Sequence, residues 1–181
     1  MTYKTATVYC CTIFSILIII ISLATNYWYE FEKKANDVKP GRVSRFRVGL
    51  FEQCETIYYN HDTEVHDDSE EKDCEDFQVP DSVDDWFPRR DTLIATYIIA
   101  MILTLIGFIF VTAYCVTGKY FFPVGRVVIC YFLSALVIII GLCVYTSTFY
   151  DLDVSFSWSY GAGWSAAAMY IIAIVLLYAD K

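Results

Sequence analysis

Four long apolar stretches dominate the pattern of hydrophobic and polar positions along the chain. They cover 6–25, 92–117, 127–148 and 159–178, and none contains a charged residue. A helix of about 20 apolar residues is long enough to cross the hydrocarbon core of a bilayer, which is about 30 Å thick. The pattern therefore predicts an all-α membrane protein built as a bundle of four transmembrane helices.

The first stretch fills a whole span, whereas the apolar core of a secretory signal peptide has about 7 to 15 residues. No Ala-x-Ala cleavage pattern follows it. The chain continues with TNYWYE, whose aromatic residues suit a membrane interface. We therefore expect a retained helix.

The short polar segments predict how the chain lies in the membrane, because basic residues favour the cytosolic side. Asp151 and Asp153 lie in the loop 149–158 on one side. The basic residues flank the other side: Lys4 in 1–5, Lys119 and Arg126 in 118–126, and Lys181 in 179–181. Both termini are therefore predicted to be cytosolic, and the long segment 26–91 extracellular.

Most of the charge of the chain lies in the segment 26–91. This segment contains 18 of the 21 acidic residues and nine of the 13 basic ones. The acidic and basic residues also gather in different parts of this segment. Positions 33–47 carry six bases and one acid, whereas positions 52–85 carry fourteen acids and one base.

Two stretches of the same segment alternate between apolar and polar residues, as a half-buried strand does. In RVSRFRVGL, Phe46, Val48 and Leu50 fall on one face. NYWYEFEK alternates similarly, and its two faces carry Tyr27, Tyr29 and Phe31 against Trp28, Glu30 and Glu32. We predict a small antiparallel extracellular β-sheet directly on the helix ends.

Cys54 and Cys74 are the two of seven cysteines that lie in the predicted extracellular segment. That compartment is oxidising, and a small domain has little core of its own, so we predict a disulfide. A zinc site with His61 and His66 is the alternative, but the spacing fits no compact zinc pattern. The acidic run between the cysteines lacks the glycine of a calcium-binding EF-hand loop. We expect no metal and no cofactor.

Ionisable residues inside a membrane usually mark a transport route, and the apolar stretches contain none. Catalytic signatures such as GxSxG, a phosphate-binding loop or HExxH are absent too. We therefore expect no catalytic residue, no enzyme activity and no nucleic-acid partner.

Small residues near the start of the fourth stretch let helix backbones approach closely. They are Gly161, Gly163, Ser165 and Ala167. We predict packing within the bundle, with a lateral self-association face as the alternative. Three cysteines near the predicted cytosolic ends of the spans are either small apolar residues or palmitoylation sites: Cys10, Cys11 and Cys115.

These features resemble the claudin superfamily, which includes claudins, peripheral myelin proteins, epithelial membrane proteins and calcium-channel gamma subunits. The motif residues are Trp28, Gly49, Leu50, Phe51, Cys54, Cys74 and Arg90. Phe51 stands where claudins have a second Trp, as a conservative apolar anchor. FYD at 149–151 and YGAGWSAAA at 160–168 are also similar to claudins, to which the resemblance is closest.

The resemblance implies a protein of the plasma membrane at cell–cell junctions, of the tight or septate type. It implies contacts with membrane lipids and assembly with copies of itself or related claudin-like proteins, both within one membrane and across the gap. The implied function is adhesion with a paracellular barrier or cation-selective permeability. Acids lining a cleft concentrate cations, and the candidate selectivity residues are Asp67, Asp68, Glu70 and Glu71.

Two other functions occur among relatives that share this architecture. One is an auxiliary, gamma-type subunit of an ion channel, which would bind a pore subunit. The other is a membrane-organising protein of the epithelial membrane protein type. Fold-level likeness does not decide among these, because function depends on surface sites.

Overall fold

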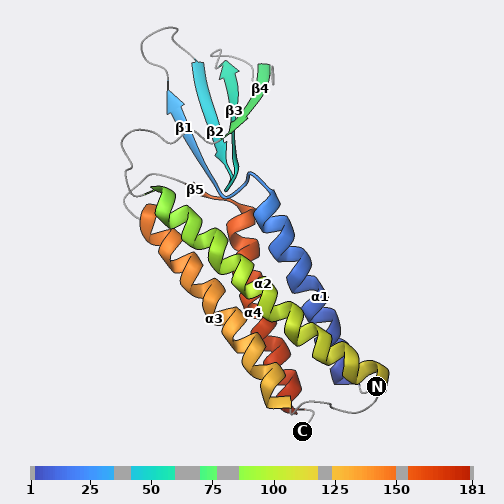
Figure 1. The fold of residues 1–181 in the computed structure, drawn as a ribbon. Helices are drawn as coiled ribbons and strands as arrows, with labels where there is room; N and C mark the ends of the chain where they lie inside the picture. Colours follow the sequence, from blue (N-terminus) through green and yellow to red (C-terminus); the bar gives the residue numbers. More distant parts are fainter. Residues whose placement is uncertain are drawn as a thin grey trace.

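Four helices and a five-stranded antiparallel sheet make up the described part of the chain (Figure 1). The computed structural model describes residues 3–34, 42–59, 70–76, 86–117, 124–149 and 155–179. The sheet stands at one end of the helix bundle, and α1 begins and α4 ends at the opposite end. The predicted four-helix bundle with a small antiparallel sheet is confirmed.

The helices are α1 (Tyr3–Ala24), α2 (Trp86–Thr117), α3 (Val124–Phe149) and α4 (Trp158–Ala179). Each is long and apolar enough to cross a membrane. Large apolar side chains are exposed along all four, among them Phe14, Ile109, Phe132 and Val175. A soluble protein rarely exposes so continuous an apolar surface, so this surface suits contact with lipid tails.

Hydroxyl groups connect the helices in the middle of the bundle. Thr12 of α1 donates a 2.9 Å hydrogen bond to the Tyr131 hydroxyl of α3. The Thr104 hydroxyl of α2 is hydrogen-bonded to that of Tyr170 in α4 at 2.7 Å and to that of Ser134 in α3 at 3.2 Å. Hydrophobicity alone does not hold helices together in lipid, so such bonds and close packing determine how they associate.

The strands are β1 (Tyr29–Lys34), β2 (Arg42–Val48), β3 (Glu52–Tyr59), β4 (Glu70–Asp76) and β5 (Ser155–Phe156). Their order in the sheet is β4-β3-β2-β1-β5. The two strands that the alternating pattern predicted are β1 and β2. The sequence pattern did not predict β4, whose residues EEKDCED are almost all charged; it pairs with β3, to which a disulfide links it.

Candidate functional site

Trp28 is the central residue where the sheet meets the bundle. It lies in the link between α1 and β1, and its side chain is fully buried. Its indole Nε1 donates a 2.8 Å hydrogen bond to the Ser22 carbonyl of α1. The Tyr97 ring of α2 and the Tyr145 ring of α3 contact the indole edge-to-face, at centroid distances of 5.8 and 5.1 Å. One side chain therefore joins the start of the sheet to three helices.

Backbone hydrogen bonds on both sides of Trp28 hold the two links between sheet and helices together. The Trp28 amide donates to the Val48 carbonyl at the end of β2, and the Ser157 amide donates to the Trp28 carbonyl, both at 3.0 Å. The Ser159 amide, in the first turn of α4, donates to the Tyr27 carbonyl at 3.2 Å. The α1–β1 link and the β5–α4 link are thus fixed to each other.

The turn between β2 and β3 packs against the link between α1 and β1. Its backbone is closed by a 2.9 Å hydrogen bond from the Gly49 amide to the Glu52 carbonyl. A Cβ at Gly49 would lie 2.6 Å from the Asn26 Cα, so only glycine fits this close approach. Leu50 is fully buried, whereas Phe51 is 55% exposed. Of the two apolar motif residues, Leu50 therefore anchors the turn in the core, whereas the side chain of Phe51 lies at the surface.

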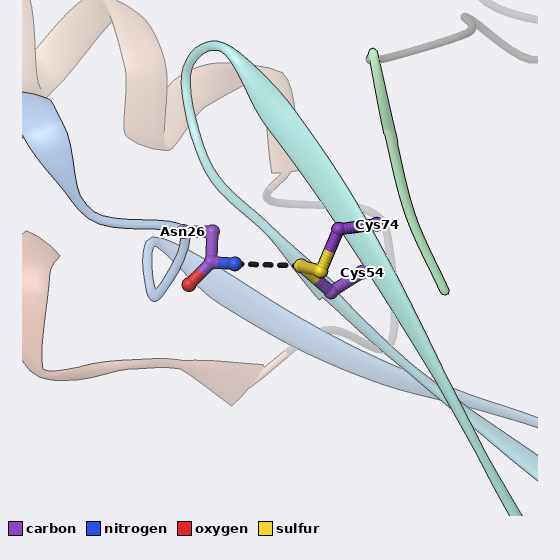
Figure 2. The surroundings of a disulfide bond; sticks show 3 residues. All are labelled: Asn26, Cys54 and Cys74. Atoms are coloured by element: carbon purple, nitrogen blue, oxygen red, sulfur yellow. Dashed lines mark hydrogen bonds between the residues drawn. A yellow bond between two sulfur atoms is a disulfide. The ribbon is translucent and has the colours of Figure 1, made fainter. Parts of the chain in front are cut away.

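The disulfide predicted between Cys54 and Cys74 is present (Figure 2). The two residues face each other in the β3–β4 register, with a Cα–Cα distance of 4.1 Å. Cys54 is buried and Cys74 exposed. The side-chain amide of Asn26 donates a 2.7 Å hydrogen bond to Cys54 Sγ. The edge strand β4 is thereby connected, through β3, to the α1–β1 link.

The two faces of β1 and β2 differ in chemistry. One face carries stacked rings: Phe31 lies on Phe46 at 4.9 Å and on Tyr29 at 6.1 Å, measured between centroids. Burial raises the pKa of the Tyr29 hydroxyl above its ordinary value. The opposite face carries the register pair Glu30 and Arg47, whose Oε1 and Nε lie 3.6 Å apart.

The candidate selectivity residues are described only in part. Glu70 and Glu71 begin β4, at the outer edge of the sheet. Asp67 and Asp68 lie outside the described residues, as do both histidines of the zinc alternative. Within the described ranges, no group of three His, Cys, Asp or Glu residues is placed to hold a metal ion.

Arg90, the last motif residue, lies in the first turns of α2. Its guanidinium is largely buried and forms an ion pair with the exposed carboxylate of Asp91 at 3.1 Å. The pair marks the end of the apolar span next to the sheet.

The small residues of α4 divide between two faces. Gly163 and Ala167 are buried, and a Cβ at Gly163 would overlap the Tyr97 hydroxyl. Gly161 and Ser165 are exposed, and a Cβ at Gly161 would meet no atom within 4 Å. Packing within the bundle therefore accounts for Gly163 and Ala167 but not for the other two.

The cysteines considered for palmitoylation lie at the bundle end away from the sheet. Cys10 is exposed and Cys11 half-buried, and both are free thiols. Cys115 lies near the end of α2. Their acylation stays a prediction.

Several residues that attach the sheet to the helix bundle were not identified from the sequence. The rings of Tyr97 and Tyr145 pack against the indole of Trp28. Asn26 contacts both Cys54 of the disulfide and the turn between β2 and β3. For the two tyrosines a signal exists, because each is a hydroxyl-bearing aromatic residue close to the sheet-side end of an apolar span. Nothing in the local pattern marks Asn26.

Together these features define a class of protein: a four-helix membrane bundle with a small sheet at one end, fixed by a buried tryptophan and a disulfide. A family model described as the PMP-22/EMP/MP20/Claudin family matches residues 1–177. The chain belongs to this family, as the motif residues indicated. A search of individual curated proteins gives no match.

Proposed function

We propose that this protein is a claudin-like component of cell–cell contacts, which assembles side by side in the plasma membrane and forms a paracellular barrier. In this proposal the sheet is extracellular and both termini are cytosolic, as the basic residues of the short segments favour. The observation that carries the proposal is the attachment of the sheet. Trp28, the Gly49 turn and the disulfide hold it upright on the bundle, so it can meet neighbouring molecules in a fixed orientation.

The same proposal assigns ion selection to the surfaces between molecules. Within the described residues, the helices bury hydroxyl groups of serine, threonine and tyrosine, and no buried helix residue is Asp, Glu, Lys, Arg or His. The hydroxyls of Ser15, Ser22 and Thr104 donate hydrogen bonds to helix carbonyls. One bundle therefore offers no charged route for ions. The acids around Asp67, Asp68, Glu70 and Glu71 would instead line the gap between cells and favour cations.

An auxiliary subunit of an ion channel is the second candidate. The exposed face of α4 supports it, because Gly161 and Ser165 lie there beside the partly exposed indole of Trp164. Small residues next to a large apolar one suit close packing against another transmembrane helix. That helix would belong to a pore subunit in this second candidate, and to another copy of the chain in the first.

Expression in cells that lack their own claudins tests the proposal. Labelled protein should concentrate where two expressing cells touch, and not where an expressing cell touches a non-expressing one. Purification in mild detergent should then recover copies of the chain. Uniform surface staining together with a co-purifying pore subunit would replace the first function by the second. Uniform staining with neither copies nor a pore subunit would favour the membrane-organising role.

A further inference from the structure

In the part of the chain that the structure describes, both edges of the sheet are open over part of their length. Within the described residues, β4 has a neighbouring strand only on the side of β3. At the other edge, β5 pairs with β1 at Tyr29 and Glu30, and among the strands that the structure describes none lies beside positions 31–34 on that side. Open edges offer unpaired backbone N–H and C=O groups to a further strand.

The two edges differ in the sign of their charge. The edge strand β4, EEKDCED, has five acids and one base. The open part of β1 is FEKK, and the neighbouring strand β2 adds three arginines. Pairing of β4 with β4, or of β1 with β1, would bring like charges together, which is unfavourable across strands. Pairing of β4 with β1 brings opposite charges together.

We propose that the β4 edge of one molecule pairs with the open β1 edge of the next in the same membrane. This inference rests on the proposed function, because it specifies how copies assemble side by side. Strand direction supports it. β1 leaves the end of α1 and runs away from the bundle, and the antiparallel order makes β4 run back toward it. Copies in one membrane share an orientation, so β4 and β1 meet antiparallel, whereas β4 and β4 would meet parallel.

The register of the sheet gives a second, independent reason. Successive pairings place Glu32 of β1 in one row with Lys72 of β4, and Lys33 in the next row with Glu70. If these rows continue from one molecule to its neighbour, each of these residues lies opposite a charge of the other sign. The single acid of the basic edge then faces the single base of the acidic edge.

An edge that binds a different edge does not close on itself in a dimer. Such heterologous contacts continue into a ring or an open row, depending on the rotation between neighbours. Pairing of β4 with β1 would therefore generate rows of molecules within one membrane. Main-chain hydrogen bonds would hold the row, and the charge pairs would select the partner edge.

Cross-linking in intact membranes tests the pairing. A chain carrying both Lys33→Cys and Glu70→Cys, oxidised mildly and run without reductant, should give a ladder of dimers, trimers and larger species. Chains with either substitution alone are the matched controls and should stay monomeric. A dimer from Glu70→Cys alone would show β4–β4 pairing and overturn the proposal. So would the absence of a ladder from the double variant at contacts where the protein still concentrates, a result that leaves the proposed function intact.

Charge reversal provides a second test that does not depend on thiol chemistry. Lys33→Glu with Lys34→Glu makes both edges acidic. Glu70→Lys with Glu71→Lys makes positions 70–72 basic, which is the part of β4 in register with Glu32 and Lys33 of the open β1 edge. Each variant should lose lateral self-association, measured by energy transfer between labelled copies on single cells, by roughly tenfold. The variant with all four substitutions should regain it, because the edges are complementary again. Failure of this rescue, or unchanged transfer in both two-residue variants, contradicts the inference.

Discussion

The indole Nε1 of Trp28 lies 2.8 Å from the carbonyl oxygen of Ser22, six residues earlier in the chain, and donates a hydrogen bond to it. Ser22 is in the last turns of α1, where helix carbonyls lack an intrahelical partner. The bond therefore satisfies a buried acceptor at the helix end and fixes the direction in which the chain leaves the membrane. The sheet takes its orientation from this point.

Replacing Trp28 by alanine should destabilise the protein by about 3 to 5 kcal/mol, the usual cost of removing a buried large aromatic side chain. Trp28→Ala removes the ring between Tyr97 and Tyr145 and leaves the Ser22 carbonyl without its indole donor. Thermal unfolding in detergent measures the change. The control is Trp158→Ala, since the Trp158 side chain is 50% exposed. Equal melting temperatures for the two variants would remove Trp28 from its central role.

Gly163→Ala should lower stability by about 1 to 3 kcal/mol, the range for overpacking a filled core. The added methyl group would overlap the Tyr97 hydroxyl and lie 3.2 Å from Leu142 Cδ2. Gly161→Ala is the matched control in the same helix, because a Cβ there meets nothing within 4 Å. It should be neutral or gain up to about 1 kcal/mol from helix propensity. The melting temperatures of both variants check the prediction, and a loss confined to Gly161→Ala would contradict it.

Removing the disulfide with Cys54→Ser and Cys74→Ser should cost about 2 to 5 kcal/mol. The loss follows because β4 is a highly charged edge strand that the Cys54–Cys74 bond ties to the rest of the sheet. Peptide mapping by mass spectrometry without reductant should find the two cysteines linked in the intact protein. Free thiols at both positions would rule out the bond and, with it, this explanation of how β4 is held.

The sequence predicted the elements whose signal is local and long. Runs of apolar residues predicted the four membrane helices. The alternation in RVSRFRVGL predicted β2, which ends at Val48, before Leu50. Contacts between distant segments carry no such signal. Strand β5 has only two residues and exists because β1 offers it hydrogen bonds. The alternation also placed Trp28 on the strand face of Glu30, but the strand begins at Tyr29 and Trp28 turns into the bundle.

The site was predictable where family motifs and oxidising chemistry gave the residue types, as for Cys54 and Cys74. The site was not predictable where packing between distant segments decides which side chains are buried. Phe51 and Leu50 are both large and apolar, so residue type does not tell that Leu50 is buried and Phe51 exposed. In the same way, the small residues of α4 were expected to pack within the bundle, whereas Gly163 is buried and Gly161 is exposed.

Neutralising the acids of the candidate selectivity region should reduce the preference for cations. The variant carries Asp67→Asn, Asp68→Asn, Glu70→Gln and Glu71→Gln, which keep side-chain size and remove charge. The expected loss of selectivity arises because a neutral gap no longer concentrates counter-ions. Dilution potentials across a cell layer measure it, and Asp91→Asn, at the start of α2, is the control. An unchanged cation preference would make these acids a solvated loop without a role in selection.

We propose that this protein forms a paracellular barrier or a cation-selective path between cells. The most direct measurement compares ion passage across layers of claudin-deficient cells with and without the wild-type protein. The expressing layer should show a higher electrical resistance, or anion passage that falls relative to cation passage. Identical resistance and identical ion ratios, with the protein present at cell contacts, would contradict it.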